Sequence, residues 1–112
     1  MSYNPDMISH PERSEIQLEG VLHALSDPVR LRIARELAQV AGERRCGSFE
    51  CAVTKSTMTH HFKVLREAGV IRQRQEATLR LTSLRRDDLD ARFPDLLDRI
   101  LEAAEEEAVL TA

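Results

Sequence analysis

TKSTMTHHFKVLREAG (residues 54–69) and the residues directly after it, VIRQRQEATLRLTSL (residues 70–84), indicate the fold more clearly than any other part of the chain. Apolar residues recur in the first part at spacings of four and then three: Met58, Phe62 and Leu65. This spacing predicts a helix over about 55–68 with one buried face. The second part predicts two strands over about 70–83, joined by a polar turn. A helix that leads into a basic hairpin is typical of a winged helix-turn-helix.

The charge of the chain is distributed unevenly. Its 112 residues, 42% of them apolar, support one domain with a modest core, and the net charge is −3. Residues 54–86 carry eight basic and two acidic side chains, whereas residues 87–112 carry two basic and nine acidic ones. Because phosphate affinity depends on local charge, the basic region predicts DNA binding by the helix and hairpin. The acidic end is expected to face away from DNA.

The rest of the pattern predicts a mainly α fold with a small two-stranded β-hairpin, an α+β class. We expect a flexible arm at residues 1–13, a domain at 14–107 with further helices at about 14–25, 28–40 and 94–107, and a frayed tail at 108–112. Asp27 before Pro28 predicts an N-cap ahead of a first-turn proline. Residues 46–52 have room for only about one turn of helix.

No stretch of the chain predicts a membrane span or a signal peptide. Apolar runs stay far below about 18 residues, and the N-terminal sequence lacks a basic segment followed by an apolar one. We therefore expect a cytoplasmic protein without membrane association, in which both cysteines are reduced.

Two segments in combination, LSDPVRLRIARELA (25–38) and TKSTMTHHFKVLREAGVIRQRQE (54–76), resemble the ArsR/SmtB family of bacterial winged-helix repressors. The resemblance covers roughly residues 15–101. It implies a homodimer that binds operator DNA and leaves it when a metal, an oxidant or a small molecule binds. The helices at 14–25 and 94–107, whose apolar stripes exceed the needs of one small core, would pair across a two-fold axis. Two-fold symmetry in turn predicts a near-palindromic operator of double-stranded DNA.

The candidate DNA contacts lie on the recognition helix and on the wing. The helix face opposite the core stripe carries the residues expected in the major groove: Ser56, Thr59, His60 and Lys63. Lys55 and Arg66 are expected nearer the phosphates, since cations mainly neutralise the backbone. The wing is expected to grip the minor groove or its phosphates through Arg72, Arg74, Thr78 and Arg80. His61 lies closer to the core stripe and is expected to be buried.

Two alternatives to this DNA interface remain open. The polar helix face is also compatible with simple solvation. A winged-helix module that binds an acidic protein partner, with no DNA sequence preference, would carry similar charges. An enzyme is not expected, because the chain has no Gly-rich phosphate loop, no metalloprotease motif and no supported Ser/His/Asp set.

The candidate sensor residues are Cys46 and Cys51, in the segment CGSFECAV (46–53) that leaves the helix before the recognition helix about a turn shorter than the family implies. The resemblance implies metal ligands either as a closer Cys pair or as Asp/His/His/Glu on the last helix, and neither pattern is present. We therefore expect no metal and no cofactor, although a mixed site of both cysteines with His23 or His10 stays open.

A redox role for the two cysteines is a further possibility. In an unbroken helix, Cα atoms five residues apart lie roughly 8–9 Å from each other. A disulfide needs roughly 4.4–6.8 Å. Oxidation would therefore have to unwind the short helix that supports the recognition helix. The alternative is that both cysteines are small buried hydrophobic residues. The sequence names neither the effector nor the operator.

Overall fold

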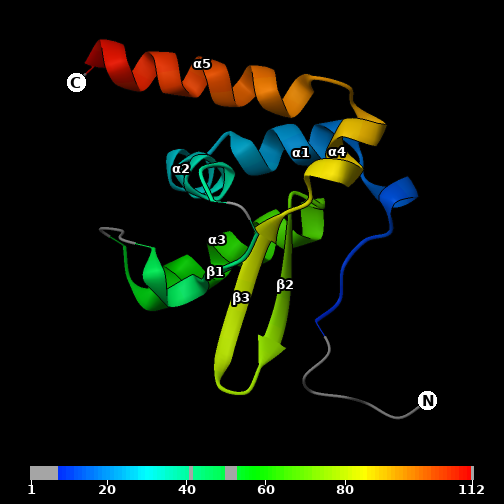
Figure 1. The fold of residues 1–112 in the computed structure, drawn as a ribbon, viewed down its shortest axis with the longest axis vertical. Helices are drawn as coiled ribbons and strands as arrows, with labels where there is room; N and C mark the ends of the chain where they lie inside the picture. The colour runs from blue at the N-terminus through cyan, green and yellow to red at the C-terminus, as the bar shows by residue number, and fades with distance from the viewer. Residues whose placement is uncertain (1–7, 41, 50–52, 112) are drawn as a thin grey trace.

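The computed structural model describes residues 8–40, 42–49 and 53–111. The elements in chain order are the 3-10 helix η1 (Arg13–Glu15), α1 (Leu18–Leu25), α2 (Pro28–Ala38), β1 (Arg44–Arg45), the 3-10 helix η2 (Cys46–Ser48), α3 (Lys55–Ala68), β2 (Ile71–Glu76), β3 (Leu79–Leu84), α4 (Arg86–Arg92) and α5 (Leu96–Thr111). Figure 1 shows α5 along one end of the molecule, with α1 and α2 beneath it. The β2–β3 hairpin projects from the opposite end. This arrangement is the winged helix-turn-helix that the sequence predicts.

The recognition helix α3 has the bounds expected from the sequence because both of its ends are set by local residues. At the start, the Thr54 hydroxyl oxygen accepts from the Thr57 N–H at 3.3 Å, as an N-cap does. At the end, Gly69 adopts φ 86°, and its N–H donates to the carbonyls of Arg66 and Leu65. A left-handed residue after the last turn suits glycine, which has no Cβ.

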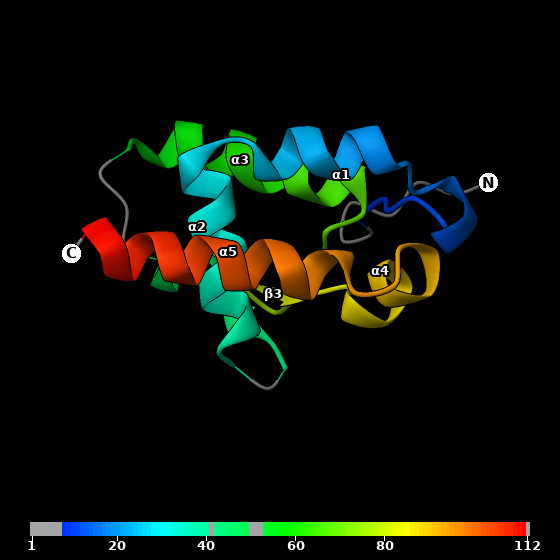
Figure 2. The same ribbon diagram turned by 90° about the horizontal axis from the view of Figure 1, so that it is seen from above.

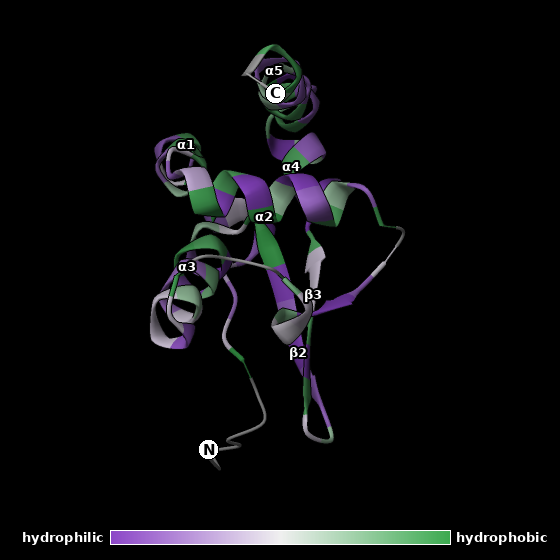
Figure 3. Ribbon diagram, turned by 90° about the vertical axis from the view of Figure 1, so that its left-hand side faces the viewer, coloured by the Kyte–Doolittle hydropathy of each residue, from purple (hydrophilic) through white to green (hydrophobic). Residues whose placement is uncertain are grey.

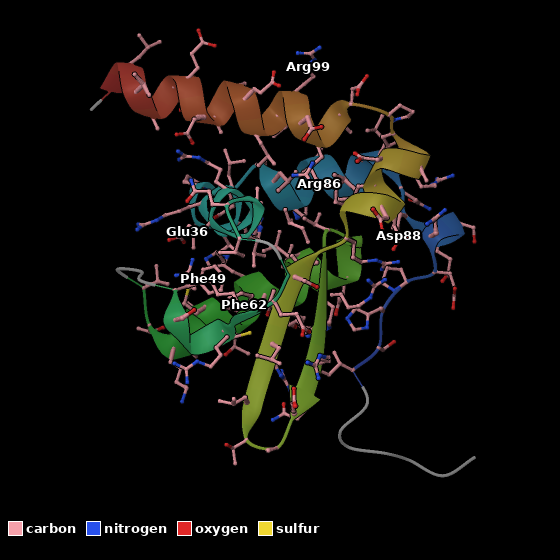
Figure 4. All side chains as sticks on the ribbon, in the orientation of Figure 1. Glu36, Phe49, Phe62, Arg86, Asp88 and Arg99 are labelled. Atoms are coloured by element: carbon pink, nitrogen blue, oxygen red, sulfur yellow. The ribbon has the colours of Figure 1, made fainter. Side chains whose placement is uncertain are left out.

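The core lies between α1, α2, α3 and the base of the hairpin. Its buried side chains are Ile16, Val21, Ala24, Leu25, Ile33, Ala34, Leu37, Phe49, Phe62, Leu65, Val70, Ile71, Leu89 and Leu97. Seen from above, α5 crosses α2, and α1 runs beside α3 (Figure 2). Phe49, just after η2, meets Phe62 of α3 edge to face at 5.4 Å between ring centroids, and both are labelled in Figure 4. The segment before the recognition helix is thereby packed onto it.

The sheet has three strands among the described residues, not the two expected. Its order is β1-β3-β2, all antiparallel, and β1 pairs Arg44 with Thr82 and Arg45 with Leu81. A strand of two arginines has no apolar alternation, so only its pairing with β3 reveals it. In the hairpin, Glu76 pairs with Leu79, which leaves a two-residue turn. Ala77 in that turn adopts φ 54°.

The expected flexible arm is wrong for residues 8–13, which are fixed to the domain; residues 1–7 lie outside the described part. The Gln73 N–H donates to His10 Nε2 at 2.9 Å, and Arg85 Nη1 donates to the Pro11 carbonyl at 2.8 Å. Arg13 Nε lies 2.7 Å from a carboxylate oxygen of Asp88. These partners are 63 to 75 residues distant in sequence, so local composition could not reveal them.

Helix α1 begins later than expected, at Leu18. Ile16 is extended, with φ −71° and ψ 124°, and its side chain is buried in the core. Its carbonyl accepts from Nε and Nη2 of Arg92, at 3.1 and 2.6 Å. An extended backbone at Ile16 is favoured over a helical turn for two reasons. It lets the carbonyl bond to a distant arginine, and it lets the side chain reach the core.

The last helix also differs from its expected range of 94–107. It begins at Leu96 because Pro94 and Asp95 form a turn in which Asp95 has φ 66°. It then continues to Thr111 through the tail that was expected to fray. Ala, Glu and Leu, which dominate residues 101–110, are strong helix formers, and the Arg35–Glu105 ion pair at 2.8 Å ties the helix to α2. Within the described part, none of the helices is both long and apolar enough to span a membrane.

Candidate nucleic-acid interface

The polar face of α3 is open to solvent, as the sequence predicts. The side chains that form it are all exposed: Lys55, Ser56, Thr59, His60 and Lys63. Phe62 and Leu65, on the opposite side, are buried, and Met58 is partly buried against the same core. The Thr59 hydroxyl donates to the Lys55 carbonyl at 3.0 Å, so its oxygen keeps lone pairs with which to accept from a base.

Glu67, for which the sequence indicates no role, is also exposed on α3. Its carboxylate lies 3.9 Å from Lys63 Nζ, and both side chains are about 60% exposed. An exposed i,i+4 pair contributes only about 0.3–0.5 kcal/mol, so it restrains Lys63 weakly. The ammonium group therefore remains available to a phosphate.

The buried side of α3 is held by an arginine whose role the sequence analysis missed. Arg30 is 8% exposed; its Nε donates to the Ala24 carbonyl at 2.7 Å, and its Nη1 lies 3.2 Å from His61 Nδ1. It thus binds the end of α1 and the inner face of α3 at once. The expected burial of His61 is confirmed, at 7% exposed. The burial of Arg30 could have been inferred from its position, three residues before Ile33 on the apolar face of α2.

The three strand arginines expected to act together lie on two faces of the hairpin. Cross-strand partners share a face, and Gln75 pairs with Arg80 just as Gln73 pairs with Thr82. Because side chains alternate along a strand, Arg72 and Arg74 point to the other face. Only Arg80 therefore shares the face on which Gln73 contacts α3. Thr78 is exposed in the turn.

Arg72 and Arg74 are both paired with carboxylates of the protein. Arg74 binds Glu43 through two hydrogen bonds, at 2.6 and 2.8 Å, and also lies 2.9 Å from Glu76. The hydrogen bonds from Arg74 hold the pKa of Glu43 below its usual value. Arg72 lies 3.2 Å from Asp88 of α4, which is labelled in Figure 4. A phosphate would have to compete with these partners.

Arg66 and Arg80 approach each other where α3 meets the hairpin. Arg66 Nη1 donates to Gln73 Oε1 at 2.7 Å, and Arg80 Nε donates to Gln75 Oε1 at 3.4 Å. Burial, and then the charge of Arg80, lower the pKa of Arg66. Two cations held near each other favour an anion between them. Figure 3 shows α3 and the β2–β3 hairpin on the side of the molecule away from α5.

Cys46 takes part in the same polar contacts. Its Sγ lies 2.8 Å from Thr82 Oγ1 and accepts from Gln73 Nε2 at 3.2 Å. Cys51, the second candidate sensor residue, lies outside the described residues. In the part of the chain that the structure describes, no three His, Cys, Asp or Glu side chains are grouped so as to hold a metal ion.

Comparison with known proteins identifies the family. A family model described as a helix-turn-helix domain matches residues 25–74. An uncharacterized HTH-type transcriptional regulator, YceK of Bacillus subtilis (strain 168), is 37% identical over an alignment of 92 residues that covers 80% of this chain and 92% of that protein. The chain belongs to the helix-turn-helix transcriptional regulators. This regulator is therefore a DNA-binding protein, and the matched regulators are not enzymes.

Solved structures identify the fold of this helix-turn-helix regulator. The ArsR family transcriptional regulator RHA00566 superposes with a TM-score of 0.60 at 18% identity, covering 85% of this chain and 97% of its own. The transcriptional repressor BigR from Xylella fastidiosa superposes with a TM-score of 0.59 at 25% identity, covering 77% of this chain and 84% of its own. Rv0081 of M. tuberculosis superposes with a TM-score of 0.57 at 23% identity, covering 81% of this chain and 91% of its own. The winged-helix fold that the resemblance to the ArsR/SmtB family implied is thus confirmed.

Proposed function

We propose that this regulator is a homodimeric repressor that inserts α3 into the major groove of a near-palindromic operator. The observation that carries the proposal is the exposed polar face of α3 beside the Arg66–Arg80 junction. The hydroxyls of Ser56 and Thr59 and the imidazole of His60 are suited to base edges. Lys55 and Lys63 carry the charge that neutralises phosphates.

Within this proposal the wing contributes unequally. Arg80 and Thr78 contact the phosphates or the minor groove directly, since neither is paired with a carboxylate among the described residues. Arg72 and Arg74 contribute only after they exchange Asp88 and Glu43 for phosphates. Arg72 and Arg74 therefore contribute less to DNA affinity than their charges suggest, because each must first release its carboxylate partner.

Exposed apolar side chains support a dimer formed through α1 and α5. Leu18 and Leu22, one turn apart on α1, are 43% and 47% exposed, and Val109 and Leu110 on α5 are 69% and 79% exposed. Pairing these faces across a two-fold axis would bury apolar surface that a monomer leaves in water. The two copies of α3 would then meet half-sites about one DNA turn, about 34 Å, apart.

Release from the operator by an effector or by thiol oxidation is part of the same proposal. In the oxidant case, a peroxide takes two electrons from the thiols of Cys46 and Cys51, which join as a disulfide while the peroxide is reduced to two waters. The contacts of Cys46 with Thr82 and Gln73 support a link from the thiol to the wing. Operator binding of the C51S variant would then resist oxidant; a variant as sensitive as the wild type contradicts the pair acting together.

The test of the main proposal is a gel shift with the DNA upstream of the regulator's own gene, repeated across salt. A dimer that neutralises about 6–10 phosphates loses roughly 10³–10⁵ in affinity between 50 and 200 mM salt. A flat salt dependence would overturn the proposal. K63A is expected to weaken binding to all DNA similarly, whereas H60A also reduces the preference for the operator over unrelated DNA.

The second candidate is a winged-helix module for an acidic protein partner. It predicts no preference between the upstream DNA and unrelated DNA of equal length, so the same gel shift separates the two. The repressor proposal also implies that the protein is cytoplasmic, because a bacterial operator lies in the cytoplasm.

A further inference from the structure

One buried amide joins the recognition helix, the wing and the segment before α3. Gln73 of β2 is 2% exposed. Its Oε1 accepts from Arg66 Nη1 of α3 at 2.7 Å. Its Nε2 donates to Cys46 Sγ of η2 at 3.2 Å and more weakly to Thr82 Oγ1 of β3 at 3.4 Å. A single side chain therefore contacts three elements that meet only through tertiary structure.

The position of Gln73 is fixed on its backbone as well. Its N–H donates to His10 Nε2 at 2.9 Å, so the segment before η1 holds the outer edge of β2 at the same residue. A buried amide that lost one of these partners would leave a polar atom unsatisfied, which is unfavourable. The side chain is consequently held in one orientation, with its oxygen toward α3.

Arg66, the partner on α3, is held at only one end of its guanidinium. Nη1 binds Gln73, while Nε has no hydrogen-bond partner among the described residues. Arg80 lies close enough to lower the pKa of Arg66, after the larger effect of burial. A planar guanidinium has five donors in a fixed fork, so anchoring one nitrogen determines where the remaining donors point.

We infer that Gln73 is a positioning residue of the DNA interface: it aims the Arg66 guanidinium at a phosphate and sets how the hairpin meets α3. The inference rests on the proposed function, in which Arg66 contacts the DNA backbone. Gln73 itself is buried and does not touch DNA. Its contribution to operator affinity passes through Arg66.

A double-mutant cycle on operator affinity tests this route. Q73M keeps the length of the side chain but removes its polar atoms, and R66M removes the guanidinium. We expect Q73M to lower operator affinity about tenfold in the wild-type background, the lower end of what one hydrogen bond to a charged group contributes. In the R66M background, the same change should alter affinity by less than about twofold.

The controls separate positioning from general stability. Q39M makes the same chemical change at an exposed glutamine after α2 and is expected to leave operator affinity unchanged. The side-chain ¹⁵N signal of Arg66 Nε gives a second measurement. It should report a restrained guanidinium in the wild type and a more mobile one in Q73M. A purely structural effect of Gln73 would not depend on whether Arg66 is present.

If Q73M does not fold, Q73N enters the same cycle, because it keeps a buried amide that is one methylene too short to reach both Arg66 and Cys46. Losses that add in the double variant overturn the inference, as does a Q73M or Q73N protein that binds the operator like the wild type. If the wild type bound the operator independently of salt, the proposed function itself would be wrong. Failure of the proposed function can therefore be distinguished from failure of the inference about Gln73.

Discussion

Gly69 illustrates how one residue joins α3 to the wing. It adopts φ 86°, and a Cβ there would lie 2.5 Å from Cγ1 of Ile16. We expect G69A to lower the free energy of unfolding by about 2–5 kcal/mol. The left-handed backbone costs about 1–2 kcal/mol and overpacking about 1–3 kcal/mol. Urea denaturation measures this loss.

Gly20 provides the matched control for that substitution. It lies within α1, and a Cβ there meets nothing within 4 Å. G20A is expected to raise stability by about 0.5–1 kcal/mol, the usual difference between Ala and Gly inside a helix. Equal stability of G69A and wild type would show that neither the φ angle nor the approach of Ile16 constrains this turn.

His10 makes the stability of the domain depend on pH. Burial lowers the pKa of His10 below 6.5, and the charges of Arg85, Arg66 and Arg72 add to this, against an opposing backbone hydrogen bond with Ile8. Since the folded state binds the proton less readily than the unfolded state, the stability that neutral His10 contributes is complete above pH 6.5. This stability is lost as the pH falls through 6.5, the pKa of His10 in the unfolded chain, and the loss levels off below the pKa in the folded state.

The corresponding measurement is urea denaturation at pH 7.5 and pH 5.5. The wild type is expected to be less stable at pH 5.5, because protonated His10 Nε2 cannot accept from Gln73 N–H. H10Q, which has no group titrating in this range, should lose less stability over the same interval. An H10Q protein with the full wild-type loss would assign the pH dependence to other groups.

At the scale of elements, the start of α3 depends on Thr54. Its side chain accepts from Thr57 N–H, and Lys55 and Ser56 occupy the first turn that this bond orders. We expect T54A to destabilise the protein by about 1 kcal/mol and to weaken operator binding. T54S keeps the hydroxyl and should behave like the wild type. Thermal unfolding and the gel shift measure the two effects; an unchanged T54A would mean that the cap contributes nothing.

Local signals predicted those elements whose ends are set by their own residues. Asp27 accepts from the N–H groups of Val29 and Arg30 and begins α2 where the sequence places it. In the same way, Thr54 sets the start of α3 and Gly69 sets its end. By contrast, β1 exists only because β3 lies beside it, and residues 8–13 are attached to the domain by Gln73, Arg85 and Asp88. No periodicity in the chain contains that information.

At the scale of the whole molecule, the exposed stripe of α1 is expected to form a dimer interface. L22E places a charge in this stripe, and we expect a shift from dimer to monomer in sedimentation velocity, together with weaker operator binding. Burying an unpaired carboxylate against apolar surface is unfavourable by several kcal/mol. V40E changes a valine that is 39% exposed beyond the end of α2 and should remain dimeric. A dimeric L22E would exclude Leu22 from the interface.

The uneven charge of the chain corresponds to opposite ends of the molecule. The acidic C-terminal helix α5 lies at the end away from the hairpin (Figure 1). The basic residues of 54–86 belong mainly to α3 and the hairpin. A duplex against α3 would therefore meet the basic region at short range, and the acidic helix lies farther away and is better screened.

The recognition helix, its two caps, its buried stripe and its polar face could all be predicted from the sequence, because they depend on residues within a few positions of one another. Which basic residues are available to DNA depends instead on tertiary contacts. The tertiary structure separated Arg80 from Arg72 and Arg74, paired the latter two with Asp88 and Glu43, and attached Arg66 to Gln73. Strand register and ion pairs form between residues distant in the chain, so charge counted along the sequence cannot distinguish a free cation from a neutralised one.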